Sequence, residues 1–191
     1  AAPSHQSDVT PTGDQDAQVQ VYSEQALRAY SQALALQPSH ADAVRHVVEL
    51  CRKLRRYSQL IEILTPIPHT PEVLAALELA HAELGDPQAL AMVLEEQLQT
   101  LAATPEPPRA RVAQITRTLA ELYQRLHRSD DEARAWERLY ELAPDELTGH
   151  VPALLALEKR YGQSGRHAEQ ASLLGRAIER LNSEQAQQQG A

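Results

Sequence analysis

One spacing recurs four times along the chain and restricts what it can fold into. In each place an apolar residue is followed four positions later by Tyr, His or Cys, and a large apolar residue stands thirteen positions beyond. The four sets are Val47, Cys51 and Leu64; Leu77, His81 and Leu94; Leu119, Tyr123 and Trp136; Leu157, Tyr161 and Leu174. An offset of four puts two side chains on one helix face, and the longer step crosses a short turn into the next helix. The pattern predicts antiparallel helix pairs that must stack to cover their apolar faces.

Prolines and glycines divide the middle of the chain into segments of helical length. We expect about nine helices, at residues 17–36, 40–54, 58–65, 71–84, 87–103, 108–127, 130–143, 146–162 and 166–182. Ser39, Thr70 and Ser129 stand where a side-chain oxygen can accept the free amides of a first helical turn. No run shows the sustained alternation of β-branched residues that indicates a strand. The expected fold class is therefore all-α.

The composition suits packed helices and excludes several classes of protein. Hydrophobic residues make up 42% of the 191 residues, but aromatic residues only 4% and Phe is absent, so Leu and Ala must fill the interior. A net charge of −8, with the basic residues scattered among 26 acidic ones, argues against a nucleic-acid binder that works by counterion release. The single Cys excludes an internal disulfide and a thiolate zinc cluster. No stretch approaches the ~20 apolar residues of a membrane span, so we expect no membrane insertion.

The two ends of the chain differ in composition from the part between them. Residues 1–16 and 183–191 are polar and show no periodicity. We therefore expect a flexible N-terminal segment, a helical repeat domain over residues 17–182 and a polar C-terminal tail. The start at Ala1, without Met, favours a secreted chain, periplasmic or extracellular, that was cut after a signal peptide, and the alternative is a trimmed cytoplasmic chain.

The first expected helix and a later one carry a second pattern. Ala26, Tyr30, Ala33 and Pro38 stand 4, 3 and 5 residues apart, and a matching pattern is formed by Trp136, Leu139, Leu142 and Pro144. With these motifs, residues 23–181 resemble the tetratricopeptide repeat (TPR) family. The aligned first helices start 30, 42 and 38 residues apart, whereas the family's repeat is about 34 residues long. The resemblance implies a right-handed α-solenoid of antiparallel helix pairs that acts as a protein-binding scaffold.

The resemblance also implies which residues meet a partner, namely those on the inner face of the first helix of each pair. This expected partner-binding face consists of Arg45, Glu49, Arg52, Ala75, Leu79, Arg117, Glu121, Leu155 and Lys159. Family members that clamp a terminal carboxylate use paired Lys and Asn there, but this chain lacks the Asn residues, and Glu49 and Glu121 would repel a carboxylate. Such a mixed face suits a peptide or helix of mixed chemistry, and the alternative is a solvated face without a ligand.

Candidates for catalysis or metal binding are few. Glu78 and His81 have the spacing of two ligands in a di-iron bundle, but the second such pair is missing, and packing explains His81. Three other close pairs each offer two ligands where a structural zinc site takes four: His46 with Glu49, His40 with Asp42, and His167 with Glu169. Nucleotide-binding loops and nucleophile elbows are also missing. We expect no enzyme, no metal and no cofactor.

One basic cluster stands out in this acidic chain. It consists of Arg52, Lys53, Arg55 and Arg56, around the turn expected after residue 54. Cations stabilise a helix C-terminus by meeting the negative end of its dipole, and we favour this interpretation. The alternative is contact with an acidic partner or with the anionic surface of a second copy.

The terminal helices are expected to leave apolar faces open. The first matches only the second half of a repeat, and the last is followed by no polar capping helix. The expected assembly face consists of Leu27, Tyr30, Leu34, Leu174, Ala177, Ile178 and Leu181. Two functions follow: a non-catalytic scaffold that binds a protein or peptide, or a structural subunit that self-assembles end to end into a filament or ring. A longer parent array would supply the missing helix without self-assembly.

Overall fold

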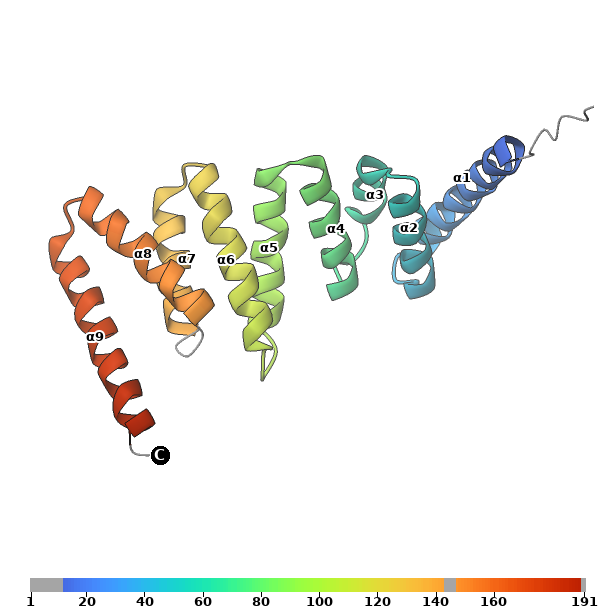
Figure 1. The fold of residues 1–191 in the computed structure, drawn as a ribbon. Helices are drawn as coiled ribbons and strands as arrows, with labels where there is room; N and C mark the ends of the chain where they lie inside the picture. The colour runs from blue at the N-terminus through green and yellow to red at the C-terminus, as the bar shows by residue number, and fades with distance from the viewer. Residues whose placement is uncertain (1–11, 143–146, 190–191) are drawn as a thin grey trace, which may run out of the picture. The chain divides into compact units, whose positions relative to one another are not determined.

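The computed structural model describes residues 12–142 and 147–189, and within these ranges the chain forms nine helices and no strand (Figure 1). The helices are α1 (Thr12–Leu36), α2 (Ala41–Lys53), α3 (Tyr57–Leu64), α4 (Pro71–Leu84), α5 (Pro87–Ala102), α6 (Arg109–Arg125), α7 (Ser129–Leu142), α8 (Leu147–Gln163) and α9 (His167–Gln189). The expected all-α fold is confirmed. None of the described helices is long and apolar enough to cross a membrane.

Most helix bounds agree with the expected ones to within two residues, and the exceptions are the outer ends of α1 and α9. α1 begins at Thr12 instead of residue 17, and α9 ends at Gln189 instead of residue 182. The added part of α9 consists of Ser, Glu, Gln and Ala. Gln, Glu and Ala are good helix formers, and lengthening an existing helix needs no new nucleus. The rest of the expected N-terminal segment, residues 1–11, lies outside the described residues.

Side chains that accept backbone amides fix the starts of three helices. His40 Nδ1 accepts the Ala43 amide of α2 at 3.3 Å. Thr70 Oγ1 accepts the Val73 amide of α4 at 3.4 Å, and Asp86 Oδ1 accepts the Ala89 amide of α5 at 3.0 Å. The cap expected at Thr70 is confirmed, whereas the one expected at Ser39 is wrong by one residue. A His ring nitrogen therefore takes the place of the more usual hydroxyl.

The four turns that follow the repeated Cys, His or Tyr share one backbone geometry. Each contains a residue with positive φ four positions later: Arg55 (54°), Gly85 (67°), His127 (56°) and Gly165 (69°). In three of these turns, the amide of the residue after the left-handed one donates a hydrogen bond to the carbonyl of the repeated residue. These bonds are Arg56 to Cys51 at 2.8 Å, Arg128 to Tyr123 at 2.9 Å and Arg166 to Tyr161 at 2.9 Å. These bonds close the helix C-termini as Schellman motifs, which require a left-handed residue.

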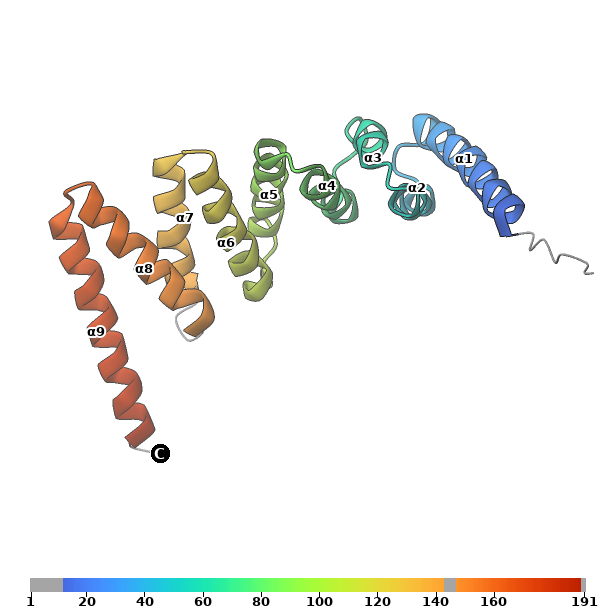
Figure 2. The same cartoon turned by 45° about the horizontal axis from the view of Figure 1, so that its top comes forward.

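The chain divides into two compact units, residues 1–85 and 86–191. In the first unit, α1 packs on α2, α2 on α3 and α3 on α4 (Figures 1 and 2). The core of this unit includes Leu27 and Leu34 of α1, Val47 and Cys51 of α2, Leu60 and Leu64 of α3, and Val73, Leu74 and Leu77 of α4. The first repeated set is thus buried as the spacing predicts.

In the second unit, α5 packs on α6, and each later helix packs on the one before it. Its core includes Leu94, Ile115, Leu119, Tyr123, Trp136, Leu139, Leu157 and Tyr161. The last repeated set departs from the prediction, because Leu173 is buried (1% exposed) and the expected Leu174 is 38% exposed. α7 packs between α6 and α8, whereas α9 packs on α8 and no later helix follows in the described chain. The position that is covered at Trp136 in α7 is therefore open at Leu174 in α9.

Polar side chains link successive helix pairs in the second unit. Tyr123 of α6 donates a hydrogen bond to Glu95 Oε1 of α5 at 2.8 Å, and Arg128 donates to the same oxygen at 3.1 Å. The guanidinium of Arg128 also lies 4.5 Å from the centre of the Tyr123 ring. The equivalent residues of the next helix pair are Tyr161, which donates to Glu137, and Arg166, at 4.8 Å from the Tyr161 ring centre. Each phenol thus lies between a carboxylate and a cation.

Candidate binding groove

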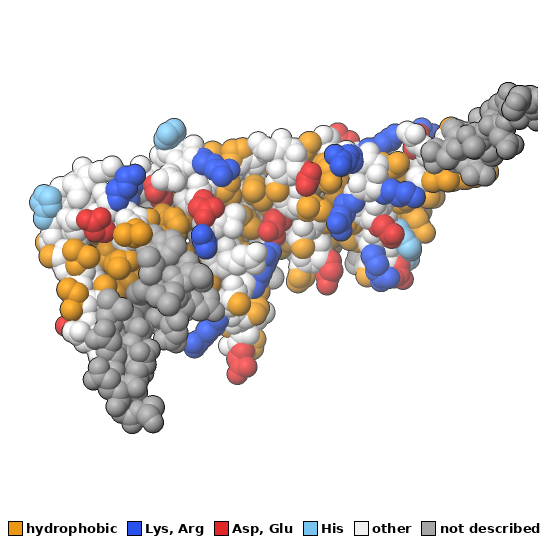
Figure 3. Space-filling model, viewed as in Figure 1, with side chains coloured by type: hydrophobic (Ala, Val, Ile, Leu, Met, Phe, Trp, Pro, Cys, Tyr) orange, Lys and Arg blue, Asp and Glu red, His pale blue; other side chains and the backbone are white. Residues whose placement is uncertain are grey.

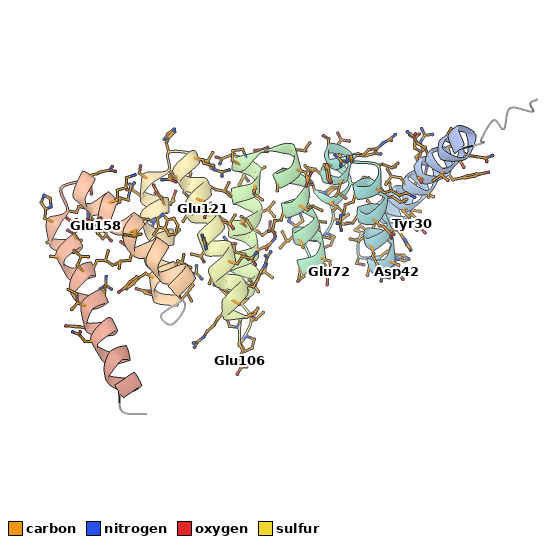
Figure 4. All side chains as sticks on the ribbon, in the orientation of Figure 1. Tyr30, Asp42, Glu72, Glu106, Glu121 and Glu158 are labelled. Atoms are coloured by element: carbon orange, nitrogen blue, oxygen red, sulfur yellow. The ribbon has the colours of Figure 1, made fainter. Side chains whose placement is uncertain are left out.

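The first unit carries a groove of about 950 Å³ between α2 and the start of α4. Its lining residues come from α2 and its two flanking turns, from the start of α3, from the loop before α4 and from the first turn of α4: Pro38, Ser39, Ala41, Val44, Arg45, Val48, Glu49, Arg52, Lys53, Arg55, Tyr57, Pro68, Thr70, Glu72 and Val73. Figure 4 labels Asp42 and Glu72, which mark the first turns of the two helices. Ligand sites usually measure ~300–1,000 Å³, so this groove is large enough to hold a segment of polypeptide.

The floor of the groove is apolar. Val44 and Val73 are buried there, and Val48 is half-buried. The loop before α4 brings Val73 opposite α2, because the Thr70 amide bonds to the Pro68 carbonyl at 2.9 Å and the Thr70 hydroxyl then caps α4. Local turn chemistry therefore builds one wall, and the amphipathic face of α2 builds the other.

Charged side chains surround this floor. Four cations, Arg45, Arg52, Lys53 and Arg55, line the groove together with two carboxylates, Glu49 and Glu72. The formal balance of the groove is +2 (4 − 2), in a chain whose net charge is −8. Figure 3 shows several Lys and Arg side chains over α2 and α3, with acidic side chains among them. The groove is thus locally basic.

Two of these charges already have partners in the first unit. Arg45 bonds to Asp42 at 2.7 Å, although both side chains are mostly exposed. The pKa of Glu72 is lowered first by its own backbone amide and then by the Thr70 hydroxyl, so the first turn of α4 holds this carboxylate in its charged form. Arg52, Lys53 and Arg55 make no ion pair with any described residue. Glu49 makes none either, so the unpaired charges of the groove are one carboxylate and three cations, in the last two turns of α2 and the turn after it.

The structure brings together part of the expected partner-binding face. Arg45, Glu49 and Arg52 line the groove side by side along α2. Ala75 is exposed and Leu79 is half-buried on α4, but neither lines the groove. The residues that sequence reasoning missed are those of the opposite wall, above all Glu72 and Val73. The Thr70-Pro71 start signal locates the first turn of α4, but it gives no information on which helix that turn faces.

The other expected partner-binding residues belong to the second unit. On α6, Arg117 and Glu121 bond to each other at 3.3 Å, and each is about half exposed. On α8, Leu155 is 61% exposed and Lys159 is exposed. Arg117 and Glu121 neutralise each other, so they add no net charge to their helix face.

The expected assembly face is wrong in its α1 half. Leu27 and Leu34 are each 1% exposed, because α2 packs against them within the same chain, and the Tyr30 ring stacks on His46 with 4.7 Å between ring centres. On α9, Ala177 is buried as well. Leu174 and Ile178, at 38% and 58% exposed, do face solvent, and the side chain of Leu181 lies outside the described residues. Periodicity located these apolar faces but not the helix that covers α1.

The histidines of the close His–carboxylate pairs have structural contacts. His40 caps α2, His46 stacks on Tyr30, and His167 Nδ1 lies 3.4 Å from Gln170 Oε1. Among the residues that the structure describes, no group of three or more His, Cys, Asp or Glu side chains could hold a metal ion. Each of these three histidines thus makes a contact with another residue of the chain.

The chain is similar to solved structures at low sequence identity. No protein-family model matches it, and no curated protein matches it either. Two crystal structures of the protein MamA are similar, both at a TM-score of 0.49: one is 16% identical over 90% of each chain, and the other is 17% identical over 95% of this chain and 99% of that one. The fold and the groove by themselves define a class, an all-α chain of helix pairs with an open basic groove.

Proposed function

We propose that the chain is a non-catalytic protein-interaction scaffold built from TPR-like helix pairs, and that it holds a segment of a partner protein in the groove between α2 and α4. The observation that carries this proposal is the groove itself, about 950 Å³ in volume, with an apolar floor and a charged rim. Grooves of this kind take a helix or an extended segment, whose apolar side chains enter the floor while its polar groups meet the rim.

Two pieces of evidence support binding over a merely solvated face. The open groove has an apolar floor, and half-buried Val48 is the floor residue that leaves apolar surface for a partner to cover, since Val44 and Val73 are only 8% and 1% exposed. Arg52, Lys53 and Arg55 beside them have no ion-pair partner in the described chain. A peptide that covers the floor and pairs with these charges would satisfy both features at once.

The experiment is a binding selection with a groove-blocking variant. Short random peptides displayed on phage are panned against the intact chain, and the affinities of the selected peptides are measured by fluorescence anisotropy. Ala41→Trp fills the groove from an exposed position, and Ala29→Trp is its matched control, because Ala29 is also an exposed helical Ala of the first unit but lies outside the lining. We expect Ala41→Trp to weaken binding by about tenfold or more, equivalent to about 1.4 kcal/mol, and Ala29→Trp to leave it unchanged. Equal effects of the two variants would reject the groove as the site.

A second function is favoured by one observation on α9. Leu174 and Ile178 stand four residues apart on one exposed helix face, and α1 exposes Val19, Val21 and Tyr22. Contact between the α9 face of one copy and the α1 face of the next would be heterologous and would produce a filament or ring. Light scattering at increasing concentration tests this function: assembly that Ile178→Asp abolishes supports it, and a chain that stays monomeric excludes it.

A further inference from the structure

We infer that the groove selects an acidic peptide segment, in which Asp or Glu residues alternate with apolar anchor residues. This inference rests on the proposed function and names the chemistry of the partner. It follows from three features of the groove: its uncompensated cations, the position of one of them beyond the end of α2, and its apolar floor.

The cations are uncompensated in a chain that has acidic residues to spare. The whole sequence has 26 Asp and Glu against 18 Lys and Arg, yet no described acidic side chain pairs with Arg52, Lys53 or Arg55. Neighbouring Arg56, by contrast, is bonded to Glu24 of α1. The three cations are exposed and accessible to a ligand, and a carboxylate that reaches them meets a concentrated positive field.

The helix dipole accounts for only part of this cluster. Arg52 and Lys53 lie in the last turn of α2, where cations are favoured. Arg55 lies beyond the helix in a left-handed conformation (φ 54°), which His127, Gly85 and Gly165 adopt at the equivalent positions of the other three turns. The turn therefore does not require a side chain, and an Arg there adds backbone strain. His127 carries the same strain, so Arg55 is distinguished by its charge and by its side chain, which lines the groove.

The apolar floor distinguishes a peptide from other polyanions. Half-buried Val48, above buried Val44 and Val73, offers nothing to phosphate groups, whereas it can contact a Leu, Ile or Val side chain of a peptide. The carboxylates of the groove add selectivity. The first turn of α4 holds Glu72 in its charged form. Glu49 lies one helical turn from Arg52, so it repels a second acidic residue of the peptide beside it and favours an apolar or neutral one there.

The test uses the peptides selected by panning, their composition, and a charge-reversal pair. We expect the selected peptides to contain more Asp and Glu than Lys and Arg, and their affinity to fall as salt is added. The double variant Arg52→Glu with Lys53→Glu should weaken the best peptide by about tenfold or more. Its matched control, Arg109→Glu with Arg138→Glu, makes the same change in net charge at exposed positions of the second unit and should have no more than about a twofold effect.

The outcomes separate this inference from the proposed function. Peptides that bind in the groove, as judged by Ala41→Trp, but carry no excess of Asp and Glu would refute the acidic partner and keep the scaffold. Failure of every peptide to bind a folded chain would reject both. A synthetic oligonucleotide or anionic vesicle that binds as tightly as the selected peptides, with the same loss in the Arg52 and Lys53 variant, would show a general anion site and overturn the peptide inference.

Discussion

The phenol of Tyr123 donates a hydrogen bond to Glu95 Oε1 at 2.8 Å, and Arg128 reaches the same oxygen at 3.1 Å. Tyr123 lies on α6, at the repeated position that is Cys51 in α2, whereas Glu95 lies on the preceding helix, α5. The repeated position thus serves two purposes in the second unit. Its ring fills the core, and its hydroxyl ties one helix to another.

This relationship predicts the effect of Tyr123→Phe. The variant keeps the ring but removes a donor to a charged acceptor, which should cost about 1–3 kcal/mol of unfolding free energy. Urea unfolding followed by circular dichroism measures the change. Tyr30→Phe is the matched control, because the Tyr30 hydroxyl makes no hydrogen bond to any residue that the structure describes and its ring stack with His46 survives the substitution. Equal loss in the two variants would contradict a role for the Tyr123 hydroxyl.

The same phenols predict a loss of stability at high pH. Burial, with the hydrogen bond to Glu137, raises the pKa of Tyr161 to about 12, and burial with Glu95 raises the pKa of Tyr123 further. An unfolded Tyr ionises near pH 10, so above that pH the unfolded state loses protons that the folded state keeps. Below about pH 10 these two phenols should not change the free energy of unfolding. Between about pH 10 and 12 the free energy of unfolding should fall by up to about 1.4 kcal/mol per pH unit for each Tyr.

Urea midpoints measured across that window, for the wild type and for Tyr123→Phe with Tyr161→Phe, test this prediction. The double variant should start less stable and lose less stability as the pH rises. Parallel curves for the two proteins would show that these phenols do not have raised pKa values.

Cys51 gives a prediction about reactivity. It is fully buried, and burial raises the pKa of its thiol to about 11 despite the charge of Arg56. At pH 8 the thiolate fraction should therefore be about 100-fold lower than for a thiol of pKa 9.0. We expect iodoacetamide to leave the folded chain unmodified on a timescale that labels a small free thiol completely, as followed by mass spectrometry. Labelling in urea is the control, and rapid labelling of the folded chain would show that Cys51 is accessible.

Sequence reasoning located the helices well because their signals are local. Proline and glycine positions, caps such as Thr70 and the repeated spacing all act within one helix or one turn, and residues 12–142 and 147–189 form nine helices near the expected bounds. The spacing failed at Leu174, where burial depends on whether a further helix follows and not on the helix itself. Local periodicity shows which positions are apolar, whereas the surrounding helices decide which of these are covered.

The groove was predictable on one wall only. Arg45, Glu49 and Arg52 share a face of α2, and helical periodicity places them together without knowledge of any other element. Glu72 and Val73 join them because the loop from residue 65 to residue 70 turns the start of α4 towards α2, and a path through an irregular loop leaves no periodic signal. The strain at Arg55 was likewise hidden, because nothing in the local sequence marks an Arg as left-handed.

The last prediction separates the two roles of Arg55. Replacing a left-handed Arg by Gly removes about 1–2 kcal/mol of backbone strain, and the extra freedom of Gly in the unfolded chain takes back about 0.4–1 kcal/mol. Arg55→Gly should therefore fold with equal or up to about 1.6 kcal/mol greater stability, and yet bind the selected peptides about fivefold more weakly, because one groove cation is gone. His127→Gly, at the equivalent turn of the second unit (φ 56°), is the matched control. It should show the same change in urea midpoint with unchanged peptide affinity, whereas unchanged affinity in Arg55→Gly would mean that this side chain does not touch the partner.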